Sequence, residues 1–271
     1  MTSVVRVEDL SWTEYRRRLE EDAPAILLPV GSLEQHGPHL PLGTDAMIAE
    51  ELSVRAAERA NALVLPALSY GYKSQPRSGG GNHFIGTTSL DGATLTHQVR
   101  DLLKELARHG ARKVGIVNGH YENEMFLIEG IDLALRELRA DGVRDLKVVR
   151  LDYWNFTSKT TIARVFPDGR VNWALEHGAV AETSVMMHCH PAHVRLDLIP
   201  DGPAADFPPY DVYPTNTAII PPTGVLSSAK AASAEKGALL VEEYVDGIAA
   251  ALGHEFGAPR ARLRAAAPAA R

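Results

Sequence analysis

The stretch AILLPVGSLEQH, residues 25–36, joins a short apolar run to a carboxylate and an imidazole. A second stretch, KVGIVNGHYE at residues 113–122, repeats this order much later in the chain. Apolar runs of this length are typical of strands buried in a parallel sheet. Each acid and histidine group therefore begins where a predicted strand ends, which is where open α/β sheets form their active sites.

The rest of the chain alternates strand-like runs with stretches of helical periodicity, which indicates βαβ units and a mainly parallel sheet. We predict a single-domain, layered α/β/α fold over residues 1–257 and a disordered Ala/Pro/Arg tail over residues 258–271. Segments 156–178 and 200–222 are expected to be loops. Strands are expected at 25–31, 62–68, 113–118 and 146–153, and helices at 44–60, 91–109, 123–140, 181–188 and 233–254.

Composition excludes several classes of protein. The net charge of −6 provides no field that would attract nucleic acid or an anionic membrane surface. No stretch is long and apolar enough to span a bilayer. The single cysteine, Cys189, excludes an intrachain disulfide and a Cys-rich zinc site, and it fits a reducing compartment. We therefore expect a cytoplasmic protein whose metal ligands, if present, are histidines and carboxylates.

The acid and histidine groups have the spacing of metal ligands. Residues two apart in an extended segment project to the same side, so Glu34 and His36 can face one point, as can His120 and Glu122. Such ligands suit zinc or manganese, and Asp45 is a candidate bridge because a carboxylate can contact two ions. Two cations can activate a shared water and polarise a carbonyl, which predicts a hydrolase.

Each of these residues also has a structural alternative. Asp45 could cap the helix that begins beside it, because Asp is a favoured N-cap residue. Glu34 and Glu122 could be solvated loop carboxylates, and a single histidine is more often hydrogen-bonded than metal-bound. The shared location of all these residues at strand ends favours the metal centre.

Four longer stretches resemble the creatininase family, and the resemblance runs from near the N-terminus to about Phe256. They are PVGSLEQHGPHLPLGTD (29–45), YGYKSQPRSGGGNHFIGTTSLDGATLT (70–96), ARHGARKVGIVNGHYENEMFLIEGIDLALREL (107–138) and EHGAVAETSVMM (176–187). The resemblance implies two divalent metal ions, zinc or manganese, in each subunit. It places one ion on Glu34, Asp45 and His120, and the other on His36, Asp45 and Glu122.

The resemblance also implies a substrate and its contacts. Family members of this kind interconvert creatinine and creatine, and they are typically hexamers. The implied substrate-binding residues are Ser78, Tyr121, Trp154, Trp173 and His177. The alternative for each aromatic residue is core packing. Ala174 departs from the family, which can carry an acidic residue directly after the flap tryptophan.

Within that reaction, we expect His177 to protonate the leaving ring nitrogen, because imidazole titrates near neutral pH. Glu122 is expected to assist by taking a proton from the water, and Glu182 to orient His177. Two other functions remain open at this point. The chain could be another amide, peptide or formamide hydrolase with the same metal site, or a non-catalytic metal- or ligand-binding protein of this fold.

Overall fold

A single parallel sheet organises the chain in the computed structural model, which describes residues 5–257. Its strands lie in the order β2-β1-β3-β4, with bounds Ala25–Val30 for β1, Ala62–Val64 for β2, Lys113–Asn118 for β3 and Lys147–Asp152 for β4. From β1 the chain winds outward to β2, and from β3 it winds to β4 on the other side. The order of the strands therefore reverses between β1 and β3, and ligand sites form at such a switch point.

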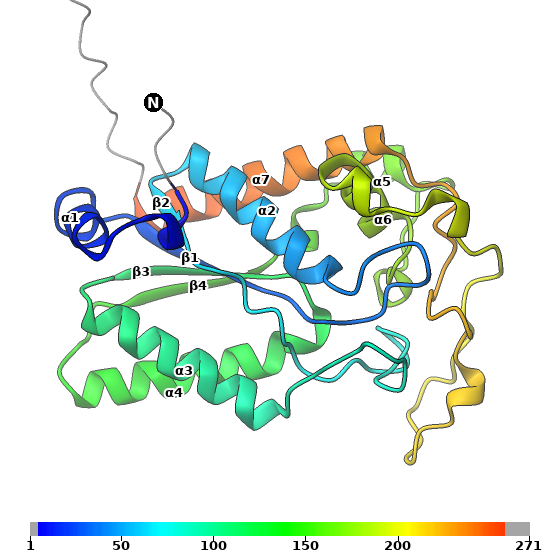
Figure 1. Cartoon of the computed structure of the whole chain (residues 1–271), viewed down its shortest axis with the longest axis horizontal. Helices are drawn as coiled ribbons and strands as arrows, with labels where there is room; N and C mark the ends of the chain where they lie inside the picture. The colour runs from blue at the N-terminus through cyan, green and yellow to red at the C-terminus, as the bar shows by residue number, and fades with distance from the viewer. Residues whose placement is uncertain (1–4, 258–271) are drawn as a thin grey trace, which may run out of the picture.

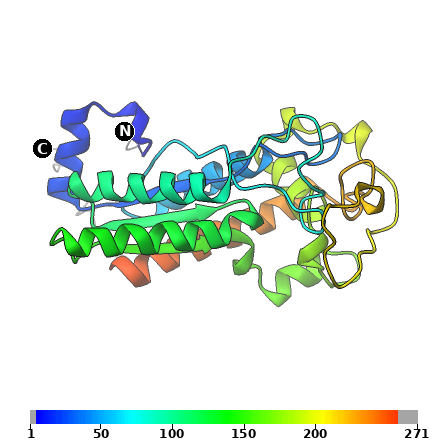
Figure 2. The same ribbon diagram turned by 90° about the horizontal axis from the view of Figure 1, so that it is seen from below.

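Helices cover both faces of the sheet, as predicted. Figure 1 shows α2 (Thr44–Arg59), α6 (Val180–Cys189) and α7 (Ala234–Phe256) on one face, with α3 (Gly92–Arg108) and α4 (Glu124–Ala140) on the other. Figure 2 shows α3 and α4 side by side along the sheet. Successive β1 side chains enter opposite layers, because Leu27 packs in one apolar core while Ile26 and Leu28 pack in the other.

Three elements differ from the predictions. Strand β2 ends at Val64 rather than at residue 68, because Pro66 has no backbone N–H to continue the ladder, and only an isolated bridge follows. Segment 156–178 is not all loop: α5 spans Lys159–Val165, and Ser158 caps it by accepting a hydrogen bond from the Thr161 backbone. A further helix, α1 (Trp12–Asp22), lies outside the predicted set and begins with a capping box.

The loops that follow the carboxyl ends of the strands gather at one end of the molecule, on the right in Figure 1. Segment 200–222 lies there too, and its one regular element is the short 3-10 turn Thr217–Ile219. Among residues 5–257, no helix has both the length and the apolar character needed to cross a membrane. The predicted disordered tail, residues 258–271, lies outside the described residues, and the single domain over 1–257 stays a prediction.

Candidate metal centre

Four predicted ligands meet at the carboxyl ends of β1 and β3. Glu34 and His36 are 1% exposed, and Asp45 and His120 are 2% exposed. Two glycines, Gly31 and Gly119, allow these segments to approach closely. A Cβ on Gly31 would lie 2.3 Å from the backbone nitrogen of Ala46, and one on Gly119 would lie 2.5 Å from the carbonyl oxygen of Asp45. Both strand ends therefore touch the first turn of α2, which carries Asp45.

Asp45 lies between the two histidines. Its Oδ1 is 2.9 Å from His36 Nε2, and its Oδ2 is 3.0 Å from His120 Nδ1. The N-cap position of α2 belongs to Gly43, so Asp45 is not the capping residue. One carboxylate that faces two imidazoles from opposite oxygens has the arrangement expected of a bridge between two ions.

Hydrogen bonds fix which nitrogen each imidazole presents to the cluster. His36 Nδ1 donates to the carbonyl oxygen of Glu34 at 3.1 Å, and His120 Nε2 donates to the carbonyl oxygen of Tyr72 at 3.0 Å. A carbonyl oxygen can only accept, so the hydrogen must lie on these nitrogens. The other nitrogen of each ring therefore faces the carboxylates and is available to a metal ion.

The donor set fits divalent cations. Glu34 Oε1, His36 Nε2 and Asp45 Oδ2 are buried and have no hydrogen-bond partner, which is costly for a polar atom. Ligand atoms of Glu34, Asp45 and His120 lie within 4.8 Å of one another, and so do those of His36, Asp45 and Glu182. Mixed imidazole and carboxylate sets of this kind suit zinc or manganese.

Electrostatics indicate the same need for positive charge. Burial raises the pKa of Glu34 to about 7. Burial also opposes charge on Asp45, but the neighbouring His36 and His120 lower the pKa of Asp45 below its usual value. Although burial favours neutral rings, the surrounding carboxylates raise the pKa of both histidines well above the usual value. Protons held by these histidines thus balance a negative cluster, which bound cations would balance instead.

Glu122 lies beside the cluster and is held by the loop after β2. Its Oε2 is 3.4 Å from His120 Nε2, while its Oε1 accepts hydrogen bonds from Ser78 Oγ at 2.6 Å and from the Gln75 backbone at 3.0 Å. These two hydrogen bonds therefore fix the orientation of the carboxylate. Its role as a metal ligand stays a prediction.

Glu182 occupies a position that sequence reasoning did not assign to it. Its Oε1 lies 3.7 Å from His36 Nε2, in the group that also contains Asp45. Its Oε2 accepts a hydrogen bond at 2.6 Å from the backbone of Gly178, the residue after His177. Glu182 therefore lies close to both His36 and the backbone beside His177, and its role in orienting His177 stays a prediction.

A cavity of about 510 Å³ opens over the cluster, a size typical of small-molecule sites. It brings together residues that are far apart in the chain, from Glu34 to Tyr244. His36 lies behind its wall and does not line it. The predicted residues that do line it are Glu34, Asp45, Ser78, His120, Tyr121, Glu122, Trp154, Trp173, His177 and Glu182.

His177 reaches this cavity from the segment before α6. Its Nε2 donates to the carbonyl oxygen of Gln35 at 2.7 Å, and its ring centroid lies 4.3 Å from that of His36. Burial lowers the pKa of His177 well below its usual value, so the resting ring is neutral. With the hydrogen on Nε2, the other nitrogen, Nδ1, is a proton acceptor.

Sequence reasoning missed several residues of the site. Gln35 lies between two predicted ligands, and its Nε2 donates to the carbonyls of Gly79 and Gly224, both at 2.9 Å, so it ties two loops to the cluster. Its position between Glu34 and His36 was the available signal. Glu176 also lines the cavity, and burial raises its pKa to about 8.

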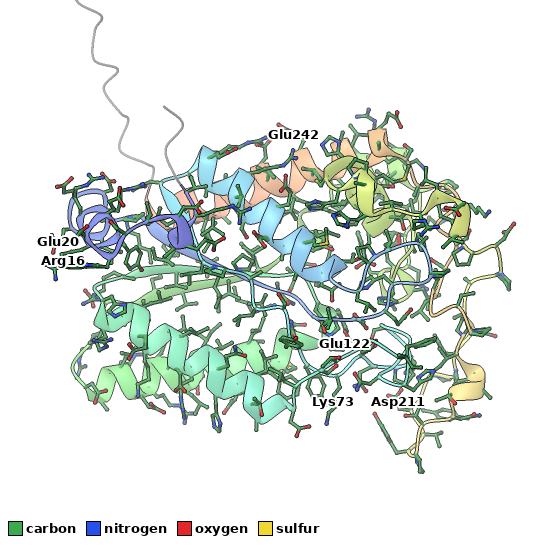
Figure 3. All side chains as sticks on the ribbon, viewed as in Figure 1. Arg16, Glu20, Lys73, Glu122, Asp211 and Glu242 are labelled. Atoms are coloured by element: carbon green, nitrogen blue, oxygen red, sulfur yellow. The ribbon has the colours of Figure 1, made fainter. Side chains whose placement is uncertain are left out.

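An ion pair closes the outer part of the cavity. Arg77 and Asp211 both line it, with 3.7 Å between the guanidinium nitrogen and the carboxylate oxygen. Glu122 and Asp211 both lie at the end of the molecule where the loops gather (Figure 3). No sequence signal joined these residues, because they are far apart in the chain and belong to irregular segments.

Comparisons with known proteins agree with this fold and show the family of the chain. The sequence profile of the creatininase family, described as creatinine amidohydrolase, matches residues 8–252. Creatinine amidohydrolase of Pseudomonas putida is 54% identical over 94% of this chain and 99% of its own length. The mycofactocin precursor peptide peptidase of Mycobacterium ulcerans is 32% identical over 86% of each chain.

Solved structures give the same result. A crystal structure of creatinine amidohydrolase (creatininase) is 54% identical and superposes with a TM-score of 0.92, covering 94% of this chain and 98% of that one. Related creatininase structures include a Zn-Zn form, a manganese form and a mutant complexed with creatine. The parallel sheet and its cluster of acids and imidazoles define a metallohydrolase of the α/β class. Within that class, the chain belongs to the creatininase family.

Proposed function

We propose that this protein is a cyclic amide hydrolase that interconverts creatinine and creatine. The observation that carries the proposal is the convergence of both candidate ligand groups and His177 on one cavity of about 510 Å³. The creatinine amidohydrolase of Pseudomonas putida, which matches nearly the whole chain, supports this substrate over other amides.

The metal centre would hold two divalent cations, zinc, manganese or one of each, because solved relatives have Zn-Zn and manganese forms. We assign Glu34, Asp45 and His120 to one ion, and His36 and Asp45 to the other, with Glu122 or Glu182 completing the second set. Bound cations would supply a water with a lowered pKa and would polarise the substrate carbonyl.

The chain itself would move the protons. Glu122, oriented by its hydrogen bond from Ser78, would take a proton from the attacking water. His177 is neutral at rest, so it must first receive that proton on Nδ1 before it protonates the ring nitrogen that leaves. Glu182 would hold His177 in place through its hydrogen bond to Gly178. Water thereby adds to the amide, and its proton ends on the departing nitrogen.

The substrate would be recognised by flat walls and a hydroxyl group. Trp154, Trp173 and Tyr121 line the cavity together with Ser78, and a planar, polar ring can stack between aromatic faces. Ala174 also lines the cavity, so no charge is available at that position. Recognition there rests on shape and stacking.

The decisive experiment incubates metal-loaded protein with creatinine and measures creatine by mass spectrometry. We expect creatine from the wild type, and none after treatment with a chelator. His177→Asn should keep the bound metal and lose turnover, and Glu122→Gln should lose turnover. Glu129→Gln provides the control, since Glu129 is an exposed α4 residue away from the cavity.

The outcomes separate the candidate functions. Metal-replete, folded protein that makes no creatine would refute the proposal. Cleavage of a peptide or formamide instead would favour another hydrolase of this family, and metal binding without any hydrolysis would favour a binding protein. We also propose a cytoplasmic homohexamer, which size measurement in solution and cell fractionation would test.

A further inference from the structure

The two histidines of the cluster are oriented in different ways. His36 donates its Nδ1 hydrogen to the carbonyl of Glu34, which is two residues away in the same segment. His120 donates its Nε2 hydrogen to the carbonyl of Tyr72, which is 48 residues away. The orientation of His36 is therefore set locally. The orientation of His120 depends on where the loop after β2 is held.

Asn123 holds that loop. Its Oδ1 accepts a hydrogen bond from the backbone of Tyr72 at 2.8 Å, and its Nδ2 donates to the carbonyl of Gly31, at the end of β1, at 3.0 Å. A Cβ on Gly71 would lie 2.6 Å from Asn123 Oδ1, so glycine is what lets the loop pass this close. Asn123 is 0% exposed, so water does not compete for these hydrogen bonds.

A second route connects Asn123 to the backbone of His120. Asn123 Nδ2 lies 3.4 Å from Asn118 Oδ1, which also accepts a hydrogen bond from the His120 backbone at 3.2 Å. Asn118 is fixed in turn, because its Nδ2 donates to Asp152 Oδ1 at 2.9 Å. Asn123 thus reaches the ring of His120 through Tyr72 and its backbone through Asn118. A buried network with its partners in place has one defined geometry.

We propose that Asn123 is a positioning residue of the metal centre, which places the Tyr72 carbonyl so that His120 offers Nδ1 to a divalent cation. Without that carbonyl, His120 Nε2 would keep only the Glu122 carboxylate, at 3.4 Å, as a nearby acceptor, and the ring could turn away from Glu34 and Asp45. The inference rests on the proposed function in one respect, that this cluster binds cations. It does not depend on creatinine being the substrate.

The first test uses the wild-type protein loaded with zinc. Nitrogen-15 NMR of the histidine side chains reports which ring nitrogen carries hydrogen. We expect hydrogen on Nε2 of His120 and on Nδ1 of His36, so the two rings should show opposite tautomers. Hydrogen on Nδ1 of zinc-bound His120 would overturn the proposal, whatever any variant does.

The second test compares zinc affinity in Asn123→Ala and the wild type by competition with a chromophoric chelator. Outer-shell partners of a ligand typically contribute 10–100-fold to metal affinity, so we expect one zinc equivalent to weaken by roughly that factor. The zinc bound through His36 should keep its affinity. Unchanged affinity for both equivalents would contradict the proposal.

Leu103→Ala is the matched control, because Leu103 is a buried α3 residue whose truncation lowers stability away from the network. It should bind both zinc equivalents as the wild type does. Equal weakening in this control would show that general instability, and not Asn123, explains the loss. Wild type that binds zinc with the expected tautomers but makes no creatine would refute the proposed function and leave the role of Asn123 standing.

Discussion

The inner and outer walls of the cavity are built in opposite ways. The inner wall consists of candidate metal ligands at strand ends that are at most 2% exposed, such as Glu34 and His120. The outer wall consists of loop residues, with Tyr121 62% exposed and Trp173 39% exposed. Close packing fixes the inner geometry before any substrate arrives, whereas exposed side chains can adapt to it. Chemistry and recognition are thus assigned to parts of the fold with different rigidity.

The largest effect should come from the inner wall. Asp45→Asn keeps the shape of the side chain and removes the charge shared by His36 and His120. We expect metal affinity to fall more than about 100-fold, beyond the effect of an outer-shell change, with creatine formation lost. Elemental analysis after dialysis, together with the turnover assay, measures both. Asp246→Asn, on the exposed side of α7, is the control. An Asp45→Asn protein that kept both metal equivalents would mean that the inner wall does not depend on this bridge.

A smaller effect is expected where the two walls meet. Ser78→Ala removes the 2.6 Å hydrogen bond to Glu122 and leaves the buried ligands in place. Hydrogen bonds to charged groups are worth about 1.5–3 kcal/mol, so we expect kcat/KM to fall roughly 10- to 150-fold while metal content is unchanged. Ser89→Ala, which removes a 2.6 Å bond to Asn82 in the same loop, is the control. Loss of metal in Ser78→Ala would show that metal binding at the inner wall depends on the loop that carries Ser78.

The smallest effect concerns the pH dependence of stability. It comes from Glu176, a carboxyl group that is part of neither the inner nor the outer wall alone. Burial raises the pKa of Glu176 to about 8 in the folded protein, against 4.5 for an ordinary glutamate. The folded state then holds a proton that the unfolded state has lost. The stability this provides is complete below about pH 4.5 and disappears as the pH rises through 8.

Glu176→Gln should therefore flatten the decline in unfolding free energy between about pH 5 and 8.5, as measured by denaturant titration. Glu129→Gln, exposed on α4, provides the comparison. The same decline in wild type and Glu176→Gln would mean that Glu176 is already ionised in the folded protein. Glu176 would then be one more negatively charged side chain of the cavity.

The inner wall could be predicted from sequence because its signals are local. An apolar run followed by Glu34 and His36 gives both a buried strand and the side to which two ligands point. The same pattern before His120 places the second group, and parallel strands bring their carboxyl ends to one edge. The doubly covered sheet follows from the uninterrupted apolar character of β1 and β3.

The rest depends on contacts that no local pattern encodes. Gln35 reaches the carbonyls of Gly79 and Gly224, and Arg77 meets Asp211, across more than a hundred residues in the longest cases. The proximity of Glu182 to His36 could not be predicted from the sequence either, because α6 is far from β1 in the chain and only the folded structure brings them together. Helix α5 was missed because it has only 7 residues, too few for a clear period.

The close approach of Gly31 and Gly119 to the first turn of α2 has a consequence for sequence tolerance. Even a single methyl group at either position would force Asp45 away from the imidazoles that it joins. We expect saturation mutagenesis to return glycine alone at both positions when growth requires the cells to form creatine from creatinine. Ile85, whose side chain is completely exposed, should accept nearly any residue. The most restricted positions of this enzyme would then be two that have no side chain.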